Sequence, residues 1–167
     1  MKQSIKQLTL NSMIAAIYLV IAIFLPSYGP LQLRLAEMFA HLPLFNKKYS
    51  LGLVLGVAVA NFWSGFGIYD VIFGSLHTIV SIWLVLKIIK KEDSLMKKMV
   101  MNAIIFSLTS FILALMVAFL SNQLAAFWTL YGSFAASIAL VMLGTIPLVL
   151  FLDKQIDFKG IMEERKE

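Results

Sequence analysis

Residues 100–120 read VMNAIIFSLTSFILALMVAFL, a run of 21 residues without a charged side chain. A helix that crosses the hydrocarbon core of a bilayer needs about 20 such residues. In the whole chain of 167 residues, 60% are hydrophobic and only 14% are charged. A soluble domain of this size would have too few polar groups to cover its surface. The composition therefore predicts an integral membrane protein, and the long apolar runs predict that it is all-α.

Similar apolar runs recur along the chain. They predict six transmembrane helices at about 8–25, 33–45, 50–63, 68–90, 98–121 and 125–152. No polar stretch between them is long enough to fold by itself, so residues 1–167 are interpreted as a single six-helix membrane domain.

Two of these runs, 33–45 and 50–63, are short. At about 1.5 Å per residue, each covers roughly 20 Å of a hydrocarbon core that is about 30 Å thick. They are expected to form either two short helices or a re-entrant hairpin, which is tolerated where other protein covers it. The segment NKKY at 46–49 joins them and carries two lysines. Lysines are costly at the bilayer centre, so this segment is expected to reach water.

The basic residues predict the orientation of the helices. If the N-terminus is cytoplasmic, 13 of the 14 Lys and Arg residues fall in cytoplasmic segments, and Arg34 alone is outside. The positive-inside rule then places both termini in the cytoplasm. It also explains the net charge of +5, because the lysines form short clusters beside apolar runs and not a nucleic-acid-binding face. Arg34 needs a different explanation.

Polar residues within the predicted helices form two stripes. On an α-helix that begins near Arg34, Glu37 and His41 share its face, because the three follow i, i+3, i+7 spacing. In the predicted helix 68–90, a second stripe consists of Asp70, Gly74, His77 and Ser81. Both stripes begin at the predicted outer surface and run inward. Together they predict the wall of a cavity better than they predict lipid-facing surfaces.

Each of these residues also has a structural interpretation. Arg34 and Glu37 could form only an ion pair at the headgroups. Asp70 could cap the helix that it begins, and either histidine could be a core residue bonded to a backbone carbonyl. Asn61, at the outer end of 50–63, is either a helix cap or an amide that contacts a ligand.

Small residues predict two helix-packing surfaces. Gly52, Gly56 and Ala60 recur every four residues, which is typical of a seam where helices pack closely. Ser12 and Ala16 form a shorter pattern of the same kind on the first predicted helix.

Several kinds of chemistry are excluded. The chain has no cysteine, so it has no disulfide, thiolate zinc site or iron–sulfur cluster. It also lacks the HExxH, GxSxG and P-loop motifs and any acidic cluster for Mg²⁺. We therefore expect no metal or cofactor and no enzymatic activity, and any ATP must bind to a different subunit.

Two segments, GPLQLRLAEMFAHLPLFN (29–46) and GLVLGVAVANFWSGFGIYDVIFGSLHT (52–78), resemble the queuosine-precursor transporter family, QueT. The resemblance implies an S component of an energy-coupling factor (ECF) transporter, a six-helix protein of the bacterial cytoplasmic membrane that binds its substrate from the outer side. The implied partners are a transmembrane coupling subunit and two cytoplasmic ATPases. Ser12 and Ala16 would then contribute to docking on the coupling subunit.

The implied substrates are 7-deazaguanines with a nitrile or aminomethyl group. A carboxylate can accept the N–H groups of a guanine-like edge, an Arg or amide can donate to its carbonyl, and aromatic rings can stack on it. The residues expected to bind substrate are Gln32, Arg34, Glu37, His41, Asn61, Asp70, His77 and Tyr131. Which carboxylate contacts which group stays open. The alternatives are an S component for another planar vitamin and a non-transporting membrane scaffold or assembly subunit.

Overall fold

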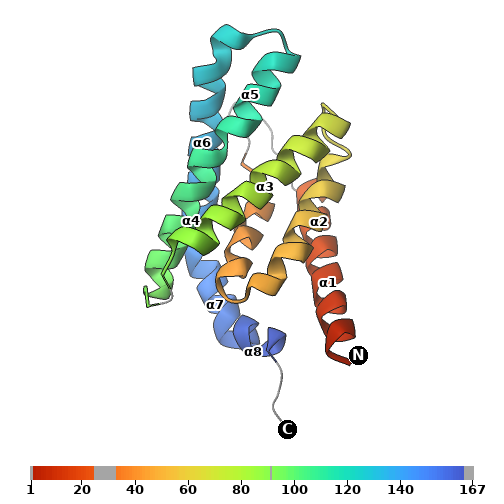
Figure 1. The fold of residues 1–167 in the computed structure, drawn as a ribbon, viewed down its shortest axis with the longest axis vertical. Coiled ribbons are helices and arrows are strands. Elements are labelled where there is room, and N and C mark those ends of the chain that lie inside the picture. The colour runs from red at the N-terminus through yellow and green to blue at the C-terminus, as the bar shows by residue number, and fades with distance from the viewer. Residues whose placement is uncertain (1, 25–32, 91, 164–167) are drawn as a thin grey trace.

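The computed structural model describes residues 2–24, 33–90 and 92–163, and every regular element in these ranges is a helix (Figure 1). The 3₁₀ helices are labelled η. In chain order the elements are α1 (Lys2–Phe24), η1 (Leu35–Leu44), η2 (Lys47–Tyr49), α2 (Ser50–Asn61), α3 (Ile68–Ile88), α4 (Leu95–Thr109), α5 (Phe111–Leu120), η3 (Leu124–Ala126), α6 (Phe127–Gly144), α7 (Ile146–Ile156) and α8 (Phe158–Met162). The prediction of an all-α fold is confirmed for the described residues.

Among the described residues, four helical stretches are long and apolar enough to cross a membrane. They are Ile5–Phe24, Ile68–Ile88, Leu95–Leu120 and Leu124–Gly144. This supports a multi-pass membrane protein. The prediction of six spans is not confirmed, because runs 33–45 and 50–63 form η1 and α2, which have only 10 and 12 residues.

η1 lies in the middle of the bundle, between α1 and α2 on one side and α4 and α6 on the other (Figure 1). Its inner residues Ala36, Ala40 and Leu42 are buried. At about 2.0 Å per residue, a 3₁₀ helix of this length extends roughly 20 Å. The neighbouring helices cover it, which is the condition under which a short, irregular segment is tolerated at membrane depth.

The predicted glycine seam packs α2 against α1. A Cβ atom added to Gly52 would lie 2.7 Å from the carbonyl oxygen of Asn11, and one added to Gly56 would lie 2.9 Å from Cβ of Tyr18. Both distances are too short for real contacts, so only glycine permits this approach. The Asn11 side chain also accepts a hydrogen bond from the Gly52 backbone N–H at 2.8 Å.

The two longest predicted helices are each broken once. α4 ends at Thr109, and the hydroxyl of the next residue, Ser110, donates to the carbonyl of Ser107 at 2.7 Å. α6 ends at Thr145, whose hydroxyl donates to the carbonyl of Val141 at 2.7 Å, and Pro147 follows in the first turn of α7. Hydroxyls bonded to a preceding carbonyl bend helices, and proline removes a backbone donor.

The lysine-bearing connections gather at one end of the bundle. Figure 1 shows the start of α1, the η1–η2 turn, the α3–α4 loop and α8 at this end, and the α2–α3 and α5–α6 turns at the opposite end. Lys47 and Lys48 are exposed, as expected for the NKKY segment.

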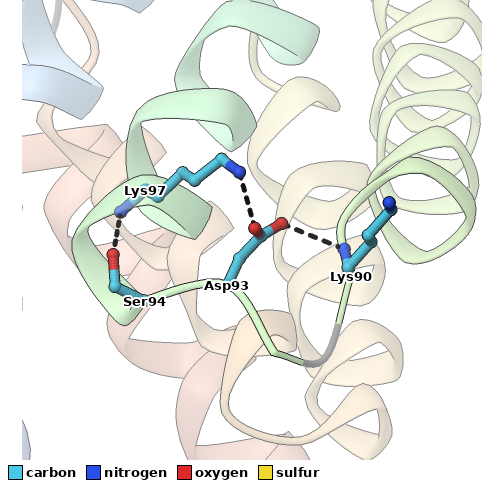
Figure 2. A network of polar contacts seen from close by, with 4 residues as sticks. All are labelled: Lys90, Asp93, Ser94 and Lys97. Atoms are coloured by element: carbon cyan, nitrogen blue, oxygen red, sulfur yellow. Dashed lines mark hydrogen bonds and ion pairs between the residues drawn. The ribbon is translucent and has the colours of Figure 1, made fainter.

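Several hydrogen bonds lie at this end of the bundle. The Tyr49 hydroxyl donates to the carbonyl of Phe158 at 2.7 Å, and burial raises the pKa of Tyr49 to about 12. In the α3–α4 loop, Asp93 accepts from Lys97 Nζ at 2.6 Å and from the backbone N–H of Lys90 at 3.2 Å (Figure 2). Ser94 caps α4 by accepting from the Lys97 backbone N–H.

Candidate functional site

A cavity of about 260 Å³ lies toward the end of the bundle opposite the lysines. Its walls come from the α2–α3 turn, α3, α5 and α6, together with Arg34 from the segment before η1. The lining residues are Arg34, Asn61, Ser64, Gly65, Phe66, Asp70, Gly74, Leu113, Met116, Val117, Leu130, Ser133 and Phe134. The volume is near the lower end of the roughly 300–1,000 Å³ typical of ligand pockets, so it suits a small solute.

Asp70 organises the α2–α3 turn that forms one wall. Its Oδ2 atom accepts from the Ser64 hydroxyl and from the Phe66 backbone N–H, the latter at 3.0 Å. Gly67 begins α3 with φ of +54°, a left-handed conformation that favours glycine. A carboxylate in the first turn of a helix is also favoured by the helix dipole. Asp70 therefore holds the turn that precedes α3 and also lines the cavity, whereas α3 itself has no side-chain N-cap hydrogen bond.

Asn61 links Arg34 to α3. Its Oδ1 atom accepts from Arg34 Nη2 at 2.8 Å, and its Nδ2 atom donates to the Asp70 carbonyl at 3.1 Å. A Cβ atom at Gly74 would collide with Asn61 Nδ2, so the glycine makes room for this amide. Asn61 is only 2% exposed. Its main role in this geometry is to hold the Arg34 guanidinium at the cavity wall.

A second, smaller compartment of about 30 Å³ adjoins the cavity. It is lined by Arg34, Glu37, Leu113, Phe134, Ser137 and Ile138, of which Arg34, Leu113 and Phe134 also line the cavity. Glu37 accepts from the Tyr18 hydroxyl at 3.5 Å. Among the described residues, the Glu37 carboxylate and the Arg34 guanidinium do not lie within 4.0 Å of each other. They therefore do not form the ion pair that the sequence allowed.

His41 does not reach either space. Its Nε2 contacts the carbonyl of Met142 at 3.0 Å and its Nδ1 contacts Asn102 Nδ2 at 3.1 Å, and the residue is fully buried. The spacing argument assumed an α-helix, but η1 is a 3₁₀ helix with three residues per turn. A residue four positions after Glu37 is then turned about 120° away from it. The shared face of Glu37 and His41 was therefore a wrong prediction.

His77 shares a face with Asp70 and Gly74, as predicted, but it lies deeper than the cavity. Its Nε2 contacts the carbonyl of Phe106 on α4 at 3.0 Å, and it is 3% exposed. Ser81, one turn further, contacts Thr109 at 2.5 Å. Thus α4 covers the inner half of this stripe, and only its outer half lines the cavity.

The remaining predicted residues are placed as follows. The Tyr131 hydroxyl donates to the carbonyl of Leu108 at 3.2 Å, and Tyr131 lines neither space. Gln32 lies outside the described residues. Ser12 and Ala16 are both exposed on α1, which is the least covered of the four long helices.

The chain is similar in sequence to known proteins. The family model described as QueT transporter matches residues 8–154. The chain belongs to the QueT transporter family. It is similar to the queuosine precursor transporter QueT of Lactococcus lactis subsp. cremoris (strain MG1363), with 34% identity over 122 residues, which are 66% of this chain and 72% of that protein. No solved structure matches the chain.

The structure of this QueT family member adds wall residues that the sequence did not single out for the site. Ser64, Phe66, Ser133 and Phe134 line the cavity, and Ser137 lines the compartment. The aromatic wall is thus made by phenylalanines, whereas Trp63 and Trp128 are exposed and line neither space. A serine in an apolar helix has the same sequence pattern whether it faces another helix or a cavity. The sequence therefore offers no signal that distinguishes the cavity serines from serines that pack between helices.

Proposed function

We propose that this chain is the substrate-binding membrane subunit of an ATP-driven, ECF-type importer, and that it binds a queuosine precursor of the 7-deazaguanine class. The observation that carries the proposal is the cavity between Arg34 and Asp70, in a chain of the QueT transporter family. A scaffold subunit would not need such a cavity. The similar Lactococcus protein is named for transport of a queuosine precursor, which favours this solute over another vitamin.

The chemistry of the cavity suits a guanine-like edge. Arg34 carries donors for a ring carbonyl, and the Asp70 carboxylate can accept ring N–H groups. Asn61 and Ser64 hold these two side chains in position through hydrogen bonds. Phe66 and Phe134 offer aromatic surface to a flat ring. A small planar solute with donors and acceptors along one edge is therefore the ligand we expect.

The proposed orientation has both termini in the cytoplasm of a bacterial cell and the cavity toward the outside. The lysine-bearing connections gather at one end of the bundle and the cavity lies toward the other, which supports this arrangement. ATP would be hydrolysed by two separate ATPases, which a transmembrane coupling subunit links to this chain. Ser12 and Ala16, exposed on α1, would dock on that coupling subunit.

Calorimetric titration of the detergent-solubilised chain with 7-aminomethyl-7-deazaguanine, guanine and unrelated vitamins tests the substrate. We expect saturable binding of the deazaguanine to the unaltered chain. In Arg34→Gln the affinity should fall by more than about tenfold, since a charge-assisted hydrogen bond is removed. Lys87→Gln is the matched control, because Lys87 stacks over Trp83 outside the cavity. If no deazaguanine binds saturably to the unaltered chain, the substrate assignment is wrong.

Co-purification with a coupling subunit and its ATPases tests the partners. Ala16→Trp adds bulk to the exposed face of α1 and is expected to reduce the amount of complex recovered. Ile79→Trp makes a similar change at an exposed position of α3 and is expected to leave recovery unchanged. Equal recovery of both variants would contradict docking through this face.

A further inference from the structure

The small compartment beside the cavity contains two polar groups whose hydrogen-bonding capacity is largely unused. Ser137 is 2% exposed, and its hydroxyl has no hydrogen-bond partner. Glu37 has the Tyr18 hydroxyl at 3.5 Å, which is long for an O–H···O bond, and no described cation lies within 4.0 Å of it. Both residues line the same 30 Å³ space.

Such groups normally have partners. Buried hydroxyls are nearly always hydrogen-bonded, and a carboxylate shielded from water is costly unless a cation or several donors compensate it. A ligand group that is positively charged and donates more than one hydrogen bond would satisfy Glu37 and Ser137 together. A primary ammonium group has both properties, since it carries three N–H donors and no acceptor.

The size of the compartment limits what can enter. A cavity needs roughly 10–15 Å³ by the same kind of measure to hold one water molecule. The 30 Å³ available therefore accommodates a group of about two or three non-hydrogen atoms and excludes a ring. A ring would remain in the 260 Å³ cavity, and a short substituent would extend past the shared wall of Arg34, Leu113 and Phe134.

Arg34 also lines the compartment, and its charge would repel an ammonium group. However, its Nη2 atom donates to Asn61 Oδ1 at 2.8 Å, and Asn61 lines the larger cavity and not the compartment. This hydrogen bond holds the guanidinium toward the larger cavity. Glu37 is the acidic residue among those that line the compartment, so its carboxylate would attract a cation that enters.

We propose that Glu37 and Ser137 bind a primary ammonium group of the substrate, so that the chain prefers 7-aminomethyl-7-deazaguanine to 7-cyano-7-deazaguanine. This inference rests on the proposed function and adds to it the identity of the substituent and a contact residue, Ser137. A nitrile nitrogen only accepts hydrogen bonds. It can use the Ser137 hydroxyl, but it is repelled by the Glu37 carboxylate.

The test is a set of titrations of the whole chain in detergent with three ligands: the aminomethyl compound, the cyano compound and unsubstituted 7-deazaguanine. We expect the unaltered chain to bind the aminomethyl compound at least about tenfold more tightly than the other two, as for a hydrogen-bonded charge. Glu37→Gln should abolish most of this preference. Ser137→Ala should weaken aminomethyl binding by about tenfold.

Ser75→Ala is the matched control, because the Ser75 hydroxyl is also buried without a partner but lines neither space. It should change none of the three affinities. Retained binding of unsubstituted 7-deazaguanine in Glu37→Gln would show that the site is still folded.

Equal affinity of the unaltered chain for all three ligands would overturn this inference and leave the proposed function intact. Equal weakening of all three by Glu37→Gln and Ser137→Ala would also overturn it, because a merely structural role predicts that result. If none of the three ligands binds, the proposed function fails and this inference fails with it.

Discussion

Replacing Gly74 by alanine should break the hydrogen bonds that hold Arg34 in place. The added methyl group would collide with the Asn61 amide nitrogen. Asn61 would have to leave its position, because the helix backbone at Gly74 cannot retreat. Its hydrogen bonds to Arg34 Nη2 and to the Asp70 carbonyl would then be lost.

The expected cost follows from these two bonds. A hydrogen bond to a charged group contributes roughly 1.5–3 kcal/mol and a neutral one about 0.5–1.5 kcal/mol. Alanine is better than glycine in a helix by about 1 kcal/mol, which offsets part of the loss. The net destabilisation should be about 1–3 kcal/mol. At roughly 2–4 °C per kcal/mol for a chain of this size, the midpoint of thermal unfolding should fall by about 4–8 °C for a 2 kcal/mol loss.

Intrinsic tryptophan fluorescence of the detergent-solubilised protein, followed on heating, measures this midpoint. Gly132→Ala provides the matched control, because a Cβ atom at Gly132 meets nothing within 4 Å. It lies inside α6 and should be neutral or slightly stabilising. The reasoning is refuted if Gly74→Ala is as stable as Gly132→Ala, or if it retains the deazaguanine affinity of the unaltered chain.

Three further predictions concern helix packing, the buried residue His41 and stability at acidic pH. Gly56→Leu should destabilise the protein by about 1–3 kcal/mol or prevent folding, because its side chain would occupy the position of Tyr18; an unchanged unfolding midpoint would contradict this. His41→Leu should lower the free energy of unfolding by about 2 kcal/mol, because the hydrogen-bond partners of His41 on α4 and α6 are lost. Ligand affinity should not change. Weaker binding at unchanged stability would instead place His41 in the candidate site. The Lys97 hydrogen bond lowers the pKa of Asp93, so this contact stabilises the fold above the ordinary carboxyl pKa of about 4 and is lost as pH falls through the lower folded value. Asp93→Asn should therefore lose less stability than the unaltered chain between pH 5 and 3, measured as unfolding midpoints, and parallel curves would argue against the contact.

The sequence predicted the cavity best where the backbone is a regular α-helix. Asp70 and Gly74 lie one turn apart on α3, and both line the cavity as their spacing indicated. The prediction for His41 failed because residues 35–44, which include Pro43, form a 3₁₀ helix, whose periodicity differs from that of an α-helix. Periodicity within one segment cannot reveal which period the packed chain adopts.

The inner part of the site depended on tertiary packing. His77 has the spacing of a cavity residue, but α4 covers it, and its partner is a backbone carbonyl that any sequence could supply. Ser137 lies in an apolar helix, yet its hydroxyl is unpaired and lines the same compartment as Glu37. Which helix stands opposite a given side chain is decided by contacts distant in sequence.

The central position of η1 has a consequence for the order of assembly during synthesis. This helix is too short to enter the bilayer as an independent span, and its His41 contacts the carbonyl of Met142, 101 residues later in the chain. Contacts of such sequence separation form only after the intervening chain has been made, and closing them is slow. The ribosome must therefore pass residue 142 before the segment that presents Arg34 and Glu37 has its native neighbours. A nascent chain arrested before α6 would contain most of the apolar mass of the protein but no completed candidate site.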